Sequence, residues 1–392
     1  MDIAFRKKAE EFVSDLPYKK PPYGNRNWGH PWHSLCSYHG KLKPAIAHWL
    51  VSDFTKEGDV VLDPLCGVGT IPFEACLQGR IGIGNDLSEL AYVVTKAKIE
   101  KPNRSGVEDV VHQLDEYIKK NKGEQSTAAY ENFGFNGKLP QYFENETYKE
   151  ILCARDFFLN RFSKISSEEA MVFSAFLHVL HGNRPYALSR HSHPLTPYAP
   201  TGEFEYKSVI EKIVQKVDAN YKKLGQTEVT QGFAIYGDYK DLETKDIVAD
   251  FIICSPPFAD SIRFYMQNWM RLWLCGWEPG DYKEADAKFL DKAQKKNFDL
   301  YYSFFEMCHN VLNENGKVIL HLGRTESVNM GIELSKRAEP WFDTVYLAGE
   351  DVSKIEKYGI KDKGATVEHL PISCSFSLMR RSVCTSSSPK AS

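Results

Sequence analysis

The stretch that most constrains the fold is a short apolar run that two prolines end abruptly. Phe251–Cys254 follows Asp250 and leads directly into Ser255–Phe258, which reads Ser-Pro-Pro-Phe. An uninterrupted apolar run of this length is typical of a strand buried on both faces of a parallel sheet. Proline has no backbone N–H for the next ladder hydrogen bond, so the strand has to end there. The Ser-Pro-Pro-Phe segment is then expected at the carboxyl end of a strand, where open α/β sheets bind ligands; the plain alternative is a proline turn.

A second strand-and-turn motif lies far upstream. The apolar strand Asp59–Leu62 runs into Asp63–Thr70, which contains Gly67 and Gly69. Glycines let a backbone approach a ligand closely, and the start of the following helix offers free N–H groups. A dinucleotide-binding fingerprint would need a third glycine at position 72, which is a proline, so that interpretation is excluded.

A further strand, Ile81–Asn85, ends at Asp86. An acid at this place accepts hydrogen bonds from ribose hydroxyls in many α/β folds. The alternative is that Asp86 caps the following helix, Ser88–Ile99, and both roles are compatible.

Composition limits the classes of function. The chain has 392 residues, of which 42% are hydrophobic and 26% charged, enough for one large core or two smaller ones. No run approaches about 18 uncharged apolar residues and the N-terminus carries no apolar segment, so neither a membrane span nor a secretion signal is expected. Nine cysteines without a C-x-x-C pair suit reduced thiols in the cytosol. The net charge of −3 means that a nucleic acid would have to meet a local positive cleft.

Histidines occur in two pairs that could suggest a metal site. These are His30 with His33, and His191 with His193. Neither pair has further cysteine, histidine or acid at ligand spacing, so no metal is expected.

The motifs, in this order on one chain, resemble the S-adenosylmethionine-dependent DNA amino-methyltransferases. The resemblance rests on Tyr38–Leu42 with its helix Pro44–Asp53, Asp63–Thr70, Gly84–Asp86 and Ser255–Phe258. It covers residues 33–101 and about 232–381. It implies an α/β fold of the Rossmann-like class I methyltransferase type, with a seven-stranded, mostly parallel sheet and one antiparallel strand near the edge.

The same resemblance divides the chain. It implies an N-terminal arm at 1–35 and a catalytic domain made of 36–101 and 232–381. Residues 102–231 form an insertion with helical periodicity at Val107–Lys119, Thr147–Phe162 and Ser167–Leu180, and this insertion is a candidate DNA-recognition region. The Ser-rich tail at 382–392 is predicted to be disordered.

S-adenosyl-L-methionine is the cofactor that the resemblance implies. In this family the glycine turn holds the methionine moiety, an acid after the second strand holds the ribose, and an acid after the third strand holds the adenine. The last role falls to Asp238, after Phe233–Gly237. The expected cofactor-binding residues are Tyr38, Lys41, Asp63, Pro64, Cys66, Gly67, Gly69, Thr70, Asp86, Leu87, Asp238 and Tyr239.

The Ser-Pro-Pro-Phe segment suits the chemistry of an exocyclic amino group. The nitrogen is a poor nucleophile because its lone pair is delocalised into the ring, and acceptors for both of its protons favour a pyramidal nitrogen. Ser255 Oγ and the Pro256 carbonyl are suitable acceptors, and Pro257 adds rigidity. Phe258 can stack on a base that has left the duplex. The methyl group then moves by in-line displacement without a covalent enzyme intermediate, so no catalytic cysteine is needed.

One loop of the insertion is unusual. The segment His181–Pro194 mixes Arg, Asn, Ser and His, the side chains that contact phosphates and base edges. A plain solvated loop fits the same composition equally well. The predicted DNA contacts are Arg184, Arg190, His191 and His193, with Arg263 on a predicted helix Ser261–Trp277.

The predicted function is site-specific methylation of cytosine N4 in double-stranded DNA with a flipped target base, in the cytoplasm of a prokaryotic cell. The family links Ser at the position of Ser255 with cytosine N4, and a restriction–modification enzyme of this kind acts beside a cognate restriction endonuclease. Three alternatives stay open: adenine N6 in DNA, a base amino group in RNA as for tRNA guanine-N2 enzymes with related proline motifs, and an inactive nucleic-acid-binding protein of the same fold.

Overall fold

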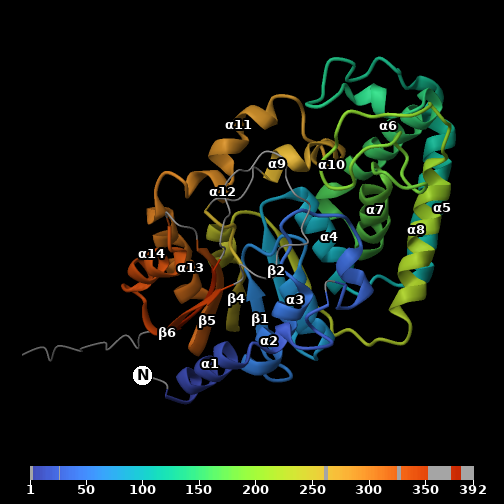
Figure 1. The fold of residues 1–392 in the computed structure, drawn as a ribbon. Helices are drawn as coiled ribbons and strands as arrows, with labels where there is room; N and C mark the ends of the chain where they lie inside the picture. Colours follow the sequence, from blue (N-terminus) through green and yellow to red (C-terminus); the bar gives the residue numbers. More distant parts are fainter. Residues whose placement is uncertain (1–2, 26, 260–263, 325–327, 352–371, 381–392) are drawn as a thin grey trace, which may run out of the picture.

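A twisted β-sheet covered by helices on both faces forms the centre of the molecule (Figure 1). The computed structural model describes residues 3–25, 27–259, 264–324, 328–351 and 372–380. Within these residues, no helix is long and apolar enough to cross a membrane.

The strands follow the order β3-β2-β1-β4-β5-β7-β6. Their bounds are β1 Val60–Asp63, β2 Ile81–Asp86, β3 Phe233–Tyr236, β4 Ala249–Cys254, β5 Leu312–Arg324, β6 Phe342–Asp351 and β7 Ile372–Arg380. The first five strands of this order are parallel to their neighbours, whereas β7 runs antiparallel to both β5 and β6. The parallel, Rossmann-like character that the sequence predicts is confirmed. The strand order reverses between β1 and β4, which makes the carboxyl ends of these two strands the switch point of the sheet.

Alternate side chains of the central strands enter two separate cores. Leu62 and Ile252 face a core that they share with α13 (Tyr301–Val311) and α14 (Met330–Ala338). Val61 and Ile253 face the opposite core, with α1 (Ile3–Asp15), α2 (Pro44–Phe54) and α3 (Thr70–Leu77). Both faces of these strands are therefore buried, which explains why they read as continuous apolar runs.

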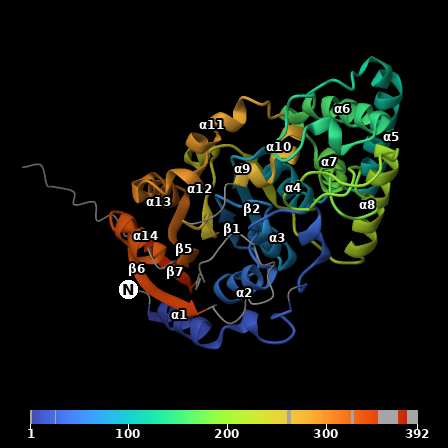
Figure 2. The same cartoon turned by 45° about the horizontal axis from the view of Figure 1, so that its top comes forward.

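The insertion forms a helical group beside the sheet. It contains α5 Arg104–Asn121, α6 Asn145–Leu159, α7 Ser167–Val179 and α8 Val209–Leu224. Figures 1 and 2 show this group next to α4 (Glu89–Ile99), away from β6, and α7 packs directly on α4. One cluster of buried residues runs through α4, the four insertion helices and α10, so the insertion shares its core with the sheet domain.

The chain that follows β4 differs from the prediction. Instead of one helix over Ser261–Trp277, the described part contains α9 (Phe264–Gln267) and α10 (Trp269–Leu274), separated at Asn268. Two further short helices, α11 (Asp281–Lys288) and α12 (Leu290–Ala293), continue above the sheet (Figure 1). The indole rings of α10 are fully buried, as the helix pattern predicts.

Candidate active site at the carboxyl edge of the sheet

The two motifs leave the sheet side by side. In the ladder between β1 and β4, Leu62 pairs with Ile252, and the strands end at Asp63 and Cys254. The Cys254 thiol hydrogen-bonds the Asp63 carboxylate, so the two strand ends are joined directly. The glycine turn and the Ser-Pro-Pro-Phe segment therefore start from neighbouring points of the same edge.

The glycine turn has a backbone that other residues would not adopt easily. Gly67 and Gly69 have φ angles of 52° and 67°. A Cβ atom on Gly69 would lie 2.7 Å from the side chain of Thr95 on α4. Thr95 Oγ1 donates to the Gly67 carbonyl (3.0 Å), and the Lys98 ammonium donates to the carbonyl of Val68. The turn is thus fixed from behind by α4.

Asp86 binds the backbone at the end of β2. Its Oδ2 accepts from the N–H of Gly67 (2.8 Å) and its Oδ1 from the N–H of Ser88 (2.9 Å). Burial raises the pKa of Asp86 to about 6. The side chain of Ser88, not Asp86, caps α4, because Ser88 Oγ accepts from the N–H of Ala91. Asp86 is therefore a half-buried acid that connects β2 to the glycine turn.

Asn85 is a site residue to which sequence analysis gave no role. Its Nδ2 donates to the carbonyls of Pro64 (3.0 Å) and Gly237 (3.2 Å). It thereby holds together the chain that leaves β1, β2 and β3. Its place in the Gly-Asn-Asp motif was the available signal.

After the third strand, Asp238 lies at this edge, and the side chain of its neighbour Tyr239 points into the core. Asp238 accepts from the N–H of Lys240 (3.1 Å) and caps the 3-10 helix η6 (Tyr239–Lys245). Tyr239 is buried, and its hydroxyl hydrogen-bonds Ser303 Oγ (3.0 Å) on α13. Its side chain thus packs in the core.

The segment Tyr38–Leu42, the cofactor-side motif, contacts the glycine turn through Tyr38. A Cβ atom on Gly67 would lie 3.5 Å from the Tyr38 hydroxyl. The Tyr38 ring also lies 5.3 Å, centroid to centroid, from that of Phe264 at the start of α9. Lys41 Nζ donates to the His33 carbonyl (2.8 Å), which fixes the motif to the preceding chain.

Buried Glu74 on α3 anchors the chain before and after this motif. Its carboxylate contacts His33 Nε2 (2.7 Å) and His48 Nδ1 (3.0 Å). Although burial opposes ionisation, the hydrogen bonds from the two imidazoles lower the pKa of Glu74 to about 2. Burial lowers the pKa of His33 to about 4, so a neutral His33 donates to an ionised Glu74 at neutral pH.

The remaining predicted cofactor residues follow the two strand ends. Pro64 and Cys66 belong to the turn after β1, Thr70 begins α3, and all three are buried. Leu87, beside Asp86, is half-buried.

The Ser-Pro-Pro-Phe segment is contacted by the end of α12 and by the end of β5. Ser255 is half-buried and Pro256 is buried. The carbonyl of Pro257 accepts a hydrogen bond from Gln294 Nε2 (2.8 Å). The Phe258 ring packs against the end of β5, where a Cβ atom on Gly323 would lie 2.6 Å from it.

The predicted nucleic-acid contacts divide into exposed and internal side chains. Arg184 and His191 are exposed. Arg190 donates to the carbonyls of Gly202 (2.7 Å) and Gln141 (3.1 Å), and the Nδ1 atom of His193 accepts from the backbone N–H groups of Leu195 and Thr196. Arg190 and His193 therefore shape the loop. Arg263 lies outside the described residues.

The loop His181–Pro194 lies near the cofactor-side motif, Tyr38–Leu42. Burial, and to a smaller extent the neighbouring imidazole of His193, lowers the pKa of His39, which adjoins Tyr38. Arg271 Nη2 of α10 also donates to the Pro194 carbonyl (2.8 Å). These contacts place the His181–Pro194 loop beside the cofactor-side motif.

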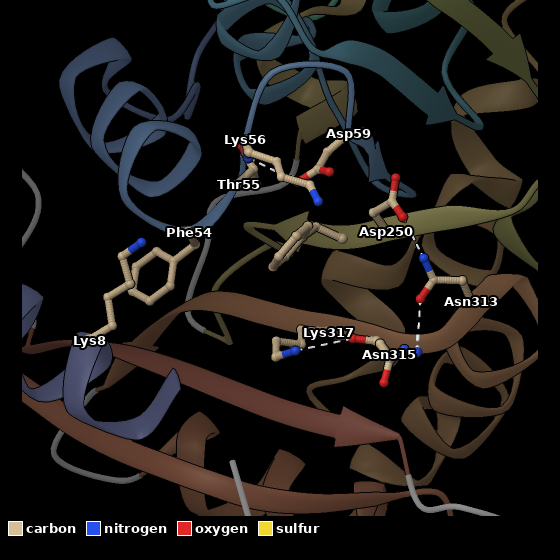
Figure 3. Close-up of a pocket in the computed structure, with 10 residues that line it drawn as sticks. Lys8, Phe54, Thr55, Lys56, Asp59, Asp250, Asn313, Asn315 and Lys317 are labelled. Atoms are coloured by element: carbon tan, nitrogen blue, oxygen red, sulfur yellow. Dashed lines mark hydrogen bonds between the residues drawn. The ribbon is translucent and has the colours of Figure 1, made fainter. Parts of the chain in front are cut away.

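A cavity of about 360 Å³ opens at the opposite edge of the sheet (Figure 3). Asp59 and Asp250, which lie at the amino ends of β1 and β4, line it. Asp250 Oδ2 accepts from the N–H of Val60 (2.8 Å) and Oδ1 accepts from Asn313, so this acid joins the starts of three strands. Three lysines also line it: Lys8, Lys56 and Lys317. This cavity is separate from the carboxyl edge where the motifs meet.

Residues 31–134 match the family of the RMKL-like methyltransferase domain (UPF0020). No curated protein matches the chain.

Several solved structures resemble it at low identity. TrmN from Thermus thermophilus has 14% identity and a TM-score of 0.32, over 90% of this chain and 52% of that one, so the chain spans about half of that protein's length. A TehB-like SAM-dependent methyltransferase from Corynebacterium glutamicum has 9% identity and a TM-score of 0.30, over 96% and 99% of the two chains. The rRNA methyltransferase aviRa from Streptomyces viridochromogenes has 12% identity and a TM-score of 0.31, over 88% of both.

The residues at the carboxyl edge fit S-adenosylmethionine. Burial raises the pKa of Asp63 to about 7, and a cationic group of the cofactor placed nearby would favour the charged carboxylate. Asp86 ends β2 and Asp238 ends the turn after β3, where carboxylates can accept hydrogen bonds from ribose hydroxyls and from the adenine amino group. The domain matched over residues 31–134 is a methyltransferase domain. Its cofactor is S-adenosylmethionine.

No group of three or more His, Cys, Asp and Glu side chains able to hold a metal ion occurs among the described residues.

Proposed function

We propose that this protein is a methyltransferase that acts on the exocyclic amino group of a nucleic-acid base. The observation that supports the proposal is the position of Ser255–Phe258, which leaves β4 directly beside Asp63 at the end of β1. The acceptor side chain and the cofactor turn thus start from adjacent strand ends, at the switch point of the sheet.

The residues of the segment have separate tasks in this proposal. When bound, S-adenosylmethionine supplies an electrophilic methyl group. Ser255 Oγ and the Pro256 carbonyl accept hydrogen bonds from the two amino protons, which localises the nitrogen lone pair. Phe258 packs with one side on β5 beside Gly323 and offers its other side to the base. Positioning supplies most of the rate enhancement.

Cytosine N4 in double-stranded DNA is the first substrate candidate. Its support is the resemblance of the ordered motifs to DNA amino-methyltransferases and the serine at position 255. In this form the target base is flipped, and a cognate restriction endonuclease is the functional partner.

A base amino group of RNA is the second candidate. Related proline motifs serve tRNA guanine-N2 enzymes, and the family that matches residues 31–134 is the RMKL-like methyltransferase domain rather than a DNA cytosine-N4 family. The same acceptor geometry serves cytosine, adenine and guanine amino groups, so experiment must identify the polymer.

The decisive experiment is nucleoside mass spectrometry of both DNA and RNA from cells that express the wild-type protein or Ser255→Ala. We expect one N-methylated base in the wild-type sample and at least about a hundredfold less in the Ser255→Ala sample, because one of two acceptors is lost. Calorimetric binding of S-adenosylmethionine should stay near the wild-type value. A new methylated base that persists at full level in Ser255→Ala cells would contradict the proposed role of this segment.

A further inference from the structure

A buried glutamine outside every motif holds the carbonyl of Pro257. Gln294 follows the last residue of α12, and its Nε2 donates to the Pro257 oxygen (2.8 Å). The Oε1 of the same amide accepts from the Tyr301 hydroxyl (2.9 Å) at the start of α13. Both side chains are 0% exposed. Because the Pro257 carbonyl can only accept, the amide turns its N–H toward Pro257 and its oxygen toward the Tyr301 hydroxyl, and the bond from Tyr301 holds it in this orientation.

The same short helix also holds the chain beyond the motif. The backbone N–H of Phe264, the first residue of α9, donates to Oδ2 of buried Asp291 on α12 (3.3 Å). The Phe264 ring packs on Tyr38 of the cofactor-side motif. Contacts from α12 therefore hold the chain on both sides of the segment that follows Phe258.

We propose that Gln294, oriented by Tyr301, is a positioning residue for methyl transfer, an inference that rests on the proposed function. The pyrrolidine ring fixes φ of Pro257, and the hydrogen bond from Gln294 fixes the direction of its carbonyl and hence ψ. With both angles fixed, the Pro256 carbonyl on one side and Phe258 on the other have set directions. The bond from Gln294 directs the Pro257 oxygen toward the end of α12, and in the proposal the Pro256 oxygen is the backbone acceptor for the amino group.

A structural role alone would give a different result. Buried polar groups in any core are usually hydrogen-bonded, and their removal lowers stability. If Gln294 and Tyr301 only stabilise the core, variants that remain folded should turn over substrate at the wild-type rate. If they position the segment, kcat falls in the folded variant, because small displacements near the reacting atoms cost rate.

The test compares Gln294→Met and Tyr301→Phe with a matched control. Tyr282 on α11 is a buried tyrosine whose hydroxyl donates to the Trp269 carbonyl (2.6 Å), so Tyr282→Phe removes a similar bond away from the segment. Activity, the Kd for S-adenosylmethionine and the melting temperature are measured for each. We expect kcat to fall at least about tenfold in Gln294→Met and about threefold in Tyr301→Phe. The Kd should change less than about twofold, and Tyr282→Phe should lose stability but keep its kcat.

Wild-type kcat in both folded variants overturns the inference while leaving the proposed function intact. A wild-type protein that methylates neither DNA nor RNA overturns the proposed function instead. Hydrogen–deuterium exchange decides the positioning role independently of substrate: peptides that cover Ser255–Ala259 should exchange faster in Gln294→Met and Tyr301→Phe than in the wild type or in Tyr282→Phe. Equal exchange in all four proteins also overturns it.

Discussion

Asp63 is the residue whose environment is most informative at the candidate site. Only 3% of its surface is exposed, and it contacts the Cys254 thiol and the N–H of Leu65. Burial raises its pKa to about 7, so the folded protein without cofactor holds a proton there that the unfolded chain releases near pH 4. Ionisation of Asp63 thus opposes folding, and its share of stability is lost as the pH rises from about 4 through about 7.

Cofactor binding should show the opposite pH dependence. A bound cation favours the Asp63 carboxylate and lowers its pKa, so affinity rises as the pH passes the pKa of the free protein. We expect the Kd for S-adenosylmethionine to be about eightfold larger at about pH 6 than at about pH 7.5. Isothermal calorimetry checks this, with Asp63→Asn as the control that reports titration of the ligand itself. Equal pH profiles for the wild type and Asp63→Asn would exclude Asp63 as the coupled group.

The roles of residues within sequence motifs could be predicted, whereas roles that depend on tertiary contacts could not. The sequence predicted Asp63 and Asp86 at strand ends and the two glycines in the turn after the first of these strands, because the strands read as short apolar runs. The bond between Gln294 and Pro257 joins positions 37 residues apart, and no periodicity or spacing marks it. Tyr239 was predicted at the cofactor site, but an aromatic ring beside a strand end packs as readily into the core, where its hydroxyl meets Ser303.

At the scale of elements, strands were easier to predict than the short helices after β4. The predicted helix Ser261–Trp277 is interrupted at Asn268, whose Nδ2 bonds to the carbonyl of Phe264 and whose backbone leaves helical geometry. Such a break depends on local side-chain bonding that a 3.6-residue pattern does not show. The helix α8 was not predicted, although Val209, Ile213 and Val217 recur every four residues and are buried.

Two nearby arginines in the loop between α7 and α8 are expected to have different roles, one in nucleic-acid binding and the other in stability. Exposed Arg184 is available to a phosphate backbone, so Arg184→Ala should weaken nucleic-acid binding and reduce the slope of log K against log salt by about 1. Arg190→Ala removes the bonds to Gly202 and Gln141 and should cost about 1–2 kcal/mol of stability. Fluorescence anisotropy across a salt series and thermal melting distinguish the two. An unchanged salt slope in Arg184→Ala would remove this loop from the interface.

At the scale of the whole molecule, buried arginines join the insertion to the sheet domain. Arg155 on α6 donates from Nε to the Trp273 carbonyl of α10 (2.8 Å). Arg271 on α10 donates to the carbonyls of Leu177 on α7 (3.0 Å) and Pro194 in the loop (2.8 Å). Since α10 follows β4 closely, these bonds connect the chain after the Ser-Pro-Pro-Phe segment to the insertion. The limits of the insertion are a prediction from the sequence, whereas its packing on the sheet domain comes from these long-range contacts and the shared core.

This arrangement predicts that the insertion and the sheet unfold together. Arg271→Met leaves one buried and one partly buried carbonyl without their donors, so it should lower the free energy of unfolding by about 2–4 kcal/mol. Arg271→Lys should lose nearly as much, because an ammonium cannot reproduce the fork of two donors. Differential scanning calorimetry should show a single transition in the wild type and in both variants, shifted to lower temperature in the variants. Two separate transitions in the wild type would show that the insertion folds independently, and the loop would then reach the active site only through a mobile connection.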